Sequence, residues 1–244
     1  MSLAAPRALP QSPMWRLRRA AGLVAIAAGL LLLTAAVGLA GRMGWGAAFA
    51  GQALAVYGLG AACMLLGLHG HAPHRRFGAA NALTLLRLAM IALLAGLVGR
   101  PLPADTGPLA WAVVAFATLT AVLDAADGPL ARSQRLASEF GARFDMECDA
   151  LLVAVLCLLI VQFDKAGAWV LLGGAMRYAF VLAGRTWRCM AQPLFPSWRR
   201  KAVCVLQITL LTVCLGPVVS RSASQAIAAA GLAMLGASFF VDLV

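Results

Sequence analysis

Six of the nine acidic residues in this 244-residue chain fall within 26 consecutive positions, from Asp124 to Asp149. The segments on either side are almost entirely apolar. A charged aspartate in the middle of a membrane helix costs about 2.5–3.5 kcal/mol, so four of them would cost roughly 10 kcal/mol before any mutual repulsion. A bound cation would offset this cost, and carboxylate oxygens are ligands that Mg²⁺ and Mn²⁺ prefer.

The spacing of four aspartates fits such a cation site. In a continuous helix, Asp124 and Asp127 lie three residues apart and share a face, and Asp145 and Asp149 lie four residues apart and also share a face. Two helices with facing carboxylate pairs would form a site made only of oxygen ligands. Glu147 lies about 200° around the helix from Asp145, so we leave it out of this site.

Glycines and arginines between the two pairs indicate that the ligand also carries phosphate. Gly128 and Gly141 would let the backbone approach a ligand closely. Arginine suits phosphate because its planar guanidinium donates hydrogen bonds in pairs, and the stretch holds Arg132, Arg135 and Arg143. Carboxylates for a metal and arginines for phosphate together favour a metal-assisted transfer of a phosphoryl-type group.

The same stretch resembles the signature of the CDP-alcohol phosphotransferase family. That signature reads Asp-x2-Asp-Gly-x2-Ala-Arg-x8-Gly-x3-Asp-x3-Asp, and the chain matches all its fixed positions: Asp124, Asp127, Gly128, Ala131, Arg132, Gly141, Asp145 and Asp149. The resemblance implies an integral membrane enzyme that holds two divalent ions, Mg²⁺ or Mn²⁺, over the diphosphate of a CDP-linked donor. It covers about residues 79–241.

The resemblance also implies a role for each matched residue. The metal site would consist of Asp124, Asp127 and Asp145, with Asp149 beside the metals as the general base on the acceptor hydroxyl. The cytidine diphosphate site would be lined by Gly128, Ala131, Arg132 and Gly141.

An upstream element, Asn81-x-Leu-Thr84-x-x-Arg87, resembles the start of the first conserved helix in this family. Asn81, Thr84 and Arg87 would then face the phosphates of the donor. The alternative is a helix cap followed by an arginine that extends its charged end to the membrane surface.

The acceptor site must be sought further along the chain. Trp198-Arg199-Arg200-Lys201, followed by Gln207, loosely resembles a Lys-x-Lys-Thr…Gln element of the phosphatidylglycerol-phosphate and cardiolipin branches, with Ala202 in place of the threonine. A charge inside an apolar segment is a functional hypothesis by default. Our candidates for binding an acceptor phosphate are Arg177, Arg200 and Lys201. The alternative is ordinary positive charge in a cytoplasmic loop.

Composition predicts an all-α polytopic membrane protein. Apolar residues make up 62% of the chain and charged residues 12%, which is unlike a soluble domain. Because a span needs about 20 apolar residues, we expect about eight transmembrane helices. They fall near residues 20–41, 46–68, 82–99, 108–124, 145–161, 167–184, 202–219 and 224–241. In such a protein the formal charge of +11 indicates cytoplasmic loops beside anionic lipids, not nucleic-acid binding.

The expected organisation has three parts. Residues 1–19 form a basic cytoplasmic tail, residues 20–78 form two accessory transmembrane helices and a loop, and residues 79–244 form a six-helix catalytic core. The accessory pair would serve helix packing, dimer formation or the access of lipid. We expect the loop with His69, His71 and His74 to be solvated, because its histidine spacing is not that of a metal-binding helix face.

The positive charges predict the orientation. With eight spans, 14 of the 20 lysines and arginines fall on the side of both termini and four on the other, while Arg87 and Arg177 lie within spans. The positive-inside rule then places both termini and the aspartates at the cytoplasmic face, as in a bacterial inner membrane. CDP-linked donors are cytoplasmic, which agrees with this orientation.

We therefore expect an enzyme of phospholipid synthesis that moves a phosphatidyl group from a CDP-linked donor to an alcohol and releases CMP. CDP-diacylglycerol is the favoured donor, and glycerol 3-phosphate or a similar polyol phosphate is the leading acceptor. Inositol phosphate, serine, a lipid acceptor and a CDP-aminoalcohol donor remain open. The rivals from other classes are a membrane transporter and a catalytically silent scaffold. Members of the family are often dimers, so the resemblance also leaves a homodimer open.

Overall fold

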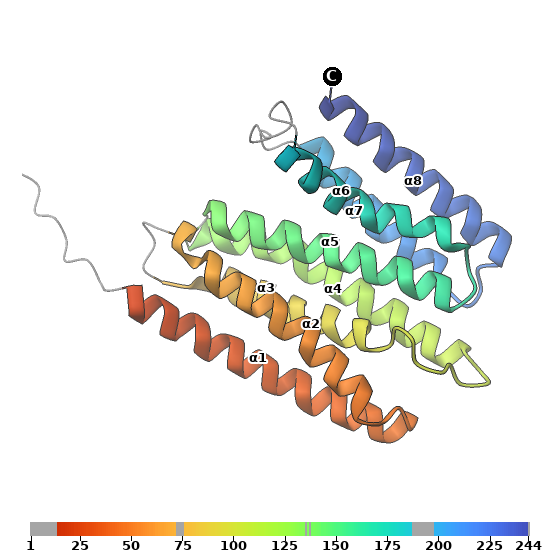
Figure 1. Ribbon diagram of the computed structural model, residues 1–244, viewed down its shortest axis with the longest axis horizontal. Coiled ribbons are helices and arrows are strands. Elements are labelled where there is room, and N and C mark those ends of the chain that lie inside the picture. The colour runs from red at the N-terminus through yellow and green to blue at the C-terminus, as the bar shows by residue number, and fades with distance from the viewer. Residues whose placement is uncertain (1–13, 72–75, 135, 137, 187–197, 244) are drawn as a thin grey trace, which may run out of the picture.

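The computed structural model describes residues 14–71, 76–134, 136, 138–186 and 198–243. In these ranges the chain forms helices and no strand (Figure 1). The α-helices are α1 (Met14–Met43), α2 (Gly46–Gly67), α3 (Gly78–Gly96), α4 (Gly107–Ser133), α5 (Glu139–Gln162), α6 (Leu171–Thr186), α7 (Trp198–Cys214) and α8 (Arg221–Leu243). Two short 3-10 turns, η1 (Leu68–His71) and η2 (Ala168–Val170), follow α2 and precede α6.

The predicted all-α, membrane-like architecture is confirmed. Within the described ranges, four segments are long and apolar enough to cross a membrane: α1, α2, α3 and residues Gly107–Ala126 of α4. A shorter apolar helix covers Lys201–Cys214. Each predicted span overlaps a helix, but the number of eight transmembrane helices stays a prediction.

Helix α3 occupies the centre of the molecule. It packs against α1 and α2 on one side and against α4 and α5 on the other, whereas α6, α7 and α8 lie beyond α4 and α5 (Figure 1). Small residues allow α2 and α3 to approach closely. A Cβ atom added to Gly60 would lie 2.8 Å from Leu88 Cδ2, and one added to Gly96 would lie 3.2 Å from the carbonyl oxygen of Phe49.

The two helices that carry the aspartates begin and end differently from the prediction. Helix α4 continues past Asp124 to Ser133, so Gly128 lies within a helix and not in the connector. Helix α5 begins at Glu139, because Ser138 caps it with a side-chain oxygen that accepts a hydrogen bond of 3.1 Å from the Gly141 amide. Gly141 therefore lies in the first turn of α5.

A tight turn joins α5 to η2 at the end of the molecule away from the start of α5. Asp164 adopts the left-handed conformation with a φ of 53°, which aspartate tolerates better than most residues. Lys165 Nζ donates hydrogen bonds of 2.9 Å and 2.7 Å to the carbonyl oxygens of Gly216 and Val219. These bonds satisfy carbonyl groups beyond the C-terminus of α7 and fix the α5 turn to the α7–α8 connection.

Candidate active site

Three aspartates meet where α3, α4 and α5 pack together. Asp124 lies in α4, and Asp145 and Asp149 lie one turn apart in α5. One carboxylate oxygen from each lies within 4.8 Å of the others. Asp124 is buried, and Asp145 and Asp149 are half-buried. The structure thus brings together three of the four aspartates that the sequence groups as metal ligands.

Arg87 of α3 reaches into this cluster and contacts all three carboxylates. Its Nη1 lies 2.6 Å from Asp124 Oδ1 and 2.5 Å from Asp145 Oδ1, and its Nη2 lies 2.6 Å from Asp149 Oδ1. The whole side chain is buried, with 0% exposure. Three negative charges and one positive charge leave the cluster with a net charge of −2.

The interpretation that Arg87 extends its charged end to the membrane surface is wrong, because the side chain is fully buried. Its contact with a donor phosphate stays a prediction. In the structure the guanidinium is the counter-ion of the aspartates. Breaking such a buried ion pair by removing one partner costs about 3–5 kcal/mol, because the remaining charge is left without compensation. Arg87 therefore holds together three like charges that would otherwise repel one another.

Several residues of the predicted site lie outside the part of the chain whose side chains are described. Four of them continue α4 after Asp124, and two are acceptor candidates in α6 and α7. Only their helical backbone is placed: Asp127, Gly128, Ala131, Arg132, Arg177 and Arg200. Their predicted roles stay predictions.

Asn81 and Gly141, both predicted at the cytidine diphosphate site, lie against each other. A Cβ atom on Gly141 would lie 3.0 Å from Asn81 Oδ1, so no larger residue fits there without a shift. Asn81 Nδ2 donates a 2.6 Å hydrogen bond to the Phe77 carbonyl oxygen, and Thr84 Oγ1 donates one of 3.1 Å to the Ala80 carbonyl oxygen. Asn81 and Thr84 are buried on the same helix as Arg87. The start of α3 thus packs on the start of α5 beside the aspartates.

Helix α7 adds a thiol that the sequence analysis did not single out. Cys204 Sγ lies 3.8 Å from Asp149 Oδ2, and Arg87 Nη2 contacts the other carboxylate oxygen, Oδ1. Lys201, an acceptor candidate, is exposed one turn earlier on α7. The i, i+3 spacing of Lys201 and Cys204 was a sequence signal for a shared face.

Gln207 belongs to the packing of the C-terminal helices. It is 2% exposed, and a Cβ atom on Gly231 of α8 would lie 2.7 Å from its Oε1. A Cβ atom on Gly173 of α6 would lie 3.4 Å from its Nε2. The amide therefore fills the space that two glycines leave between α6, α7 and α8.

The prediction of a solvated loop is wrong for His71. This side chain is fully buried, its Nε2 lies 2.8 Å from the Arg76 carbonyl oxygen, and its Nδ1 lies 2.9 Å from Ser138 Oγ. The ring also meets Phe140 edge to face, with centroids 5.7 Å apart. His71 therefore connects the segment before α3 to the N-cap of α5. Residues 72–75, including His74, lie outside the described ranges.

Arg143 lies on a different face of α5 from the aspartates. It is two residues before Asp145, which turns it about 200° around the helix. Its Nη2 donates a 2.6 Å bond to Glu139 Oε1, and both side chains are exposed. Of the three arginines predicted to contact phosphate, Arg143 alone falls among the described side chains, and it points away from the carboxylate cluster.

The carboxylate cluster fits a hard divalent cation. The three side chains offer oxygen ligands only, which is the chemistry that Mg²⁺ and Mn²⁺ require. The net charge of −2 in a mostly buried location favours binding of positive charge. Asp124, Asp145 and Asp149 are thus the described residues that would hold such an ion.

Comparison with known proteins identifies one family. Residues 77–240 match the family model of the CDP-alcohol phosphatidyltransferases. The match begins at the start of α3 and extends into α8, so α1 and α2 lie outside it. No curated protein and no solved structure matches the chain.

Proposed function

The chain belongs to the CDP-alcohol phosphatidyltransferase family, and on this premise we propose that it transfers a phosphatidyl group from CDP-diacylglycerol to an alcohol and releases CMP. The observation that carries the proposal is the cluster of Asp124, Asp145 and Asp149 inside the matched segment. A lipid donor agrees with the four apolar helices long enough to cross a membrane. Glycerol 3-phosphate or a similar polyol phosphate is the proposed acceptor.

The proposed metal ligands are Asp124, Asp127, Asp145 and Asp149, which would hold two Mg²⁺ or Mn²⁺ ions. When bound, such ions neutralise charge on a diphosphate and make CMP a better leaving group. Arg87 orients the three described carboxylates through its fork of donors. The donor's cytidine diphosphate would lie against Asn81, Thr84, Gly128, Ala131, Arg132 and Gly141.

Asp149 is the proposed general base. As the acceptor oxygen attacks the phosphorus that carries the lipid, its proton passes to the Asp149 carboxylate. The new oxygen–phosphorus bond forms while the bond from that phosphorus to the CMP oxygen breaks, and CMP leaves. Arg87 contacts Asp149 Oδ1, and Oδ2 faces Cys204 of α7, so we propose Oδ2 as the oxygen that accepts the proton.

The acceptor would therefore approach from the side of α7. Lys201 lies one turn before Cys204 on α7 and carries a positive charge. A phosphate on the acceptor would meet this ammonium group, with Arg177 and Arg200 as further proposed contacts. This geometry favours a phosphorylated acceptor over a neutral one.

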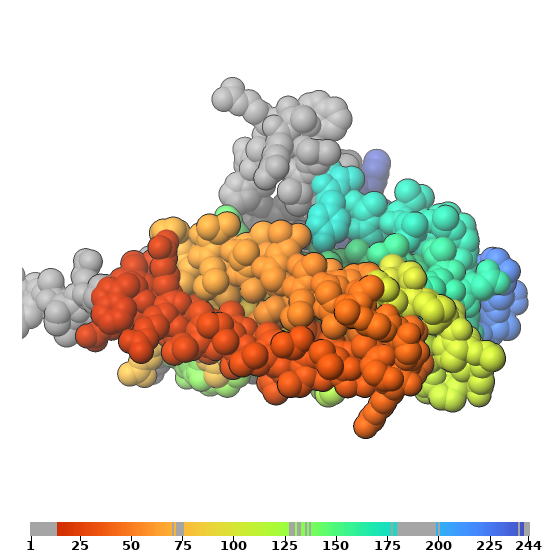
Figure 2. Space-filling model, turned by 60° about the horizontal axis from the view of Figure 1, so that its bottom comes forward, coloured from red at the N-terminus to blue at the C-terminus, as the bar shows by residue number. Residues whose placement is uncertain are grey.

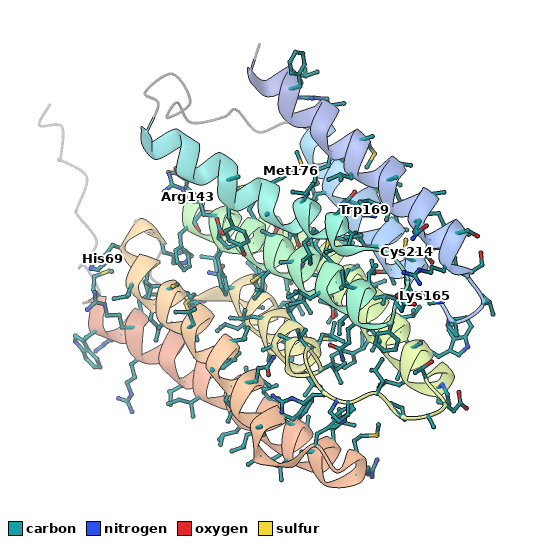
Figure 3. All side chains as sticks on the ribbon, turned by 45° about the vertical axis from the view of Figure 1, so that its right-hand side comes forward. His69, Arg143, Lys165, Trp169, Met176 and Cys214 are labelled. Carbon is teal, nitrogen blue, oxygen red and sulfur yellow. The ribbon has the colours of Figure 1, made fainter. Side chains whose placement is uncertain are left out.

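We place the site at the cytoplasmic face. The charge count assigns the end with Arg143 to the cytoplasm and the end with Lys165 to the other side. Figure 3 shows His69 and Arg143 toward one end of the helices and Lys165 and Cys214 toward the other, which supports this separation of charges.

The test is CMP release by the purified protein with CDP-diacylglycerol, Mn²⁺ or Mg²⁺ and a panel of acceptors. We expect metal-dependent release with one acceptor, reduced about 10²–10⁴-fold in Asp149→Asn, the range for loss of a general base. Asp105→Asn, an exposed change outside the site, is the control. Full release by Asp149→Asn would contradict the assigned base. No release from the folded protein with any acceptor would count against this donor.

A further inference from the structure

A groove runs between α2 and α5 on the side of α5 that faces away from the aspartates. Its volume is about 630 Å³, which lies within the range of about 300–1,000 Å³ typical of ligand sites. Glu147 lines this groove, and its position about 200° from Asp145 around α5 separates the groove from the carboxylate cluster. The groove also involves α2, which lies outside the family match.

Most of the groove lining is apolar. Its walls and floor include Leu59, Cys63 and Gly67 of α2 and Phe140, Phe144 and Leu151 of α5. Because α2 is long and apolar enough to cross a membrane, we expect this surface to lie along the hydrocarbon region. Water in such a groove is unfavourable. A hydrocarbon chain covers the apolar side chains and has no polar group that would lose its hydration.

The groove is charged along the first turns of α5. Glu139, Arg143 and Glu147 follow one another at intervals of four residues on α5, so they share a face, and all three line the groove. Two carboxylates and one guanidinium give this stretch a net charge of −1. Figure 3 shows Arg143 near the start of α5, the end nearest the predicted cytoplasmic surface.

Helix α6 contributes an aromatic side chain suited to a membrane surface. Tyr178 of α6 lines the groove and is 46% exposed. Tyrosine is enriched at the level of lipid headgroups, where its ring contacts apolar groups and its hydroxyl contacts polar ones. Figure 2 shows the surface of α6 next to that of α2 on one face of the molecule.

We propose that this groove binds one phospholipid with a zwitterionic headgroup, such as phosphatidylethanolamine. An acyl chain lies between α2 and α5, Arg143, which stays bonded to Glu139, meets the headgroup phosphate, and the ammonium group meets Glu147. Two carboxylates and one guanidinium match a headgroup that carries both charges. A purely anionic headgroup would meet net repulsion. This lipid is a second one, separate from the donor, and its site does not depend on the proposed reaction.

The experiment measures the lipid that co-purifies with the full-length protein, by native mass spectrometry after reconstitution with equal amounts of phosphatidylethanolamine and phosphatidylglycerol. We expect the wild type to retain phosphatidylethanolamine preferentially. Cys63→Trp fills the groove and should abolish retention, whereas the matched control Ala62→Trp, exposed and outside the groove lining, should not. Glu147→Gln should lower the preference about threefold to fivefold, the effect of one exposed ion pair.

Other outcomes would overturn the proposal. Equal retention by Cys63→Trp and Ala62→Trp would show that bound lipid lies elsewhere. Displacement of the retained phospholipid by CDP-diacylglycerol would assign the groove to the donor. A change in oligomeric state in Cys63→Trp, with lipid retention intact, would assign the groove to contact between two copies of the chain.

Discussion

Arg87 Nη2 contacts Asp149 Oδ1 at 2.6 Å, and this contact leaves Asp149 Oδ2 as the oxygen that faces α7. The same guanidinium contacts Asp124 and Asp145, so one side chain from α3 fixes carboxylates from two other helices. Arg87 thus connects the element that begins the family match to the proposed base and the proposed metal ligands.

The first prediction concerns the charge of Arg87. Arg87→Gln keeps a polar side chain but removes the positive charge, so the three carboxylates repel one another more strongly. We expect the metal-free protein to lose about 3–5 kcal/mol of stability, as when one partner of a buried ion pair is removed. Binding of Mn²⁺ stabilises the folded state. It should therefore raise the melting temperature more in Arg87→Gln than in the wild type, because the cation no longer competes with the guanidinium.

Thermal unfolding in detergent with and without Mn²⁺ checks this prediction. Arg221→Gln is the matched control, because Arg221 forms an exposed ion pair with Asp164 that is worth about 0–1 kcal/mol. Arg87→Lys keeps the charge but not the planar fork of donors. Its melting temperature should therefore lie between those of the wild type and Arg87→Gln. An unchanged melting temperature and an unchanged Mn²⁺ shift in Arg87→Gln would contradict the role of Arg87 as counter-ion.

The sequence was sufficient to predict that Asp145 and Asp149 share a face and that Glu147 points elsewhere. Both inferences depend only on helical periodicity within one segment, which a sequence contains. The family signature added the expectation that Asp124 joins them. The structure places these carboxylates together, and Glu147 on the groove.

The partner of Arg87 could not be predicted in the same way. Periodicity says which face of α3 carries Arg87, but its contact with Asp124 and Asp149 depends on how α3 packs between α4 and α5. His71 is a similar case, because its burial depends on its contact with Ser138, the N-cap of α5. Helix α5 begins six residues earlier than expected. Contacts between distant segments were therefore the part that local patterns missed.

The second prediction tests the contact between Gly141 and Asn81. Replacing a helical glycine by alanine usually stabilises a helix by about 0.5–1 kcal/mol. In Gly141→Ala the new methyl group would lie 3.0 Å from Asn81 Oδ1, so Asn81 must shift. We expect the KM for CDP-diacylglycerol to rise several-fold with little change in kcat, measured by CMP release. Gly38→Ala, whose added Cβ meets no atom within 4 Å, should leave KM unchanged. Equal KM values in both variants would show that Gly141 does not contribute to the donor site.

The third prediction concerns Cys204. If the acceptor approaches Asp149 Oδ2 beside α7, then Cys204→Leu should obstruct it and lower kcat/KM for the acceptor, while Cys204→Ala should retain most activity. Val205→Leu adds one carbon atom at an exposed neighbouring position and serves as the control. The melting temperature of each variant shows whether folding is affected. Full activity in Cys204→Leu would indicate that the acceptor approaches from another side.

The fourth prediction identifies the class of acceptor through Lys201. A hydrogen bond to a charged group is worth about 1.5–3 kcal/mol, so Lys201→Gln should raise the KM for a phosphorylated acceptor by about tenfold or more. The KM for CDP-diacylglycerol should stay the same, because the donor phosphates would contact the other residues of the site. Arg221→Gln, at the opposite end of the helices, is the control for a general loss of surface charge.

The comparison of acceptors makes this prediction specific. With glycerol 3-phosphate the substitution removes an ammonium group that meets the acceptor phosphate, whereas with glycerol, which carries no charge, it removes no such contact. We therefore expect a KM effect with the first and none with the second, measured by CMP release at saturating donor. An equal effect on both acceptors would show that Lys201 acts on the carboxylate cluster and not on the acceptor. An unchanged KM for both acceptors would show that other residues bind the acceptor. Arg177 and Arg200 would then be the next residues to substitute.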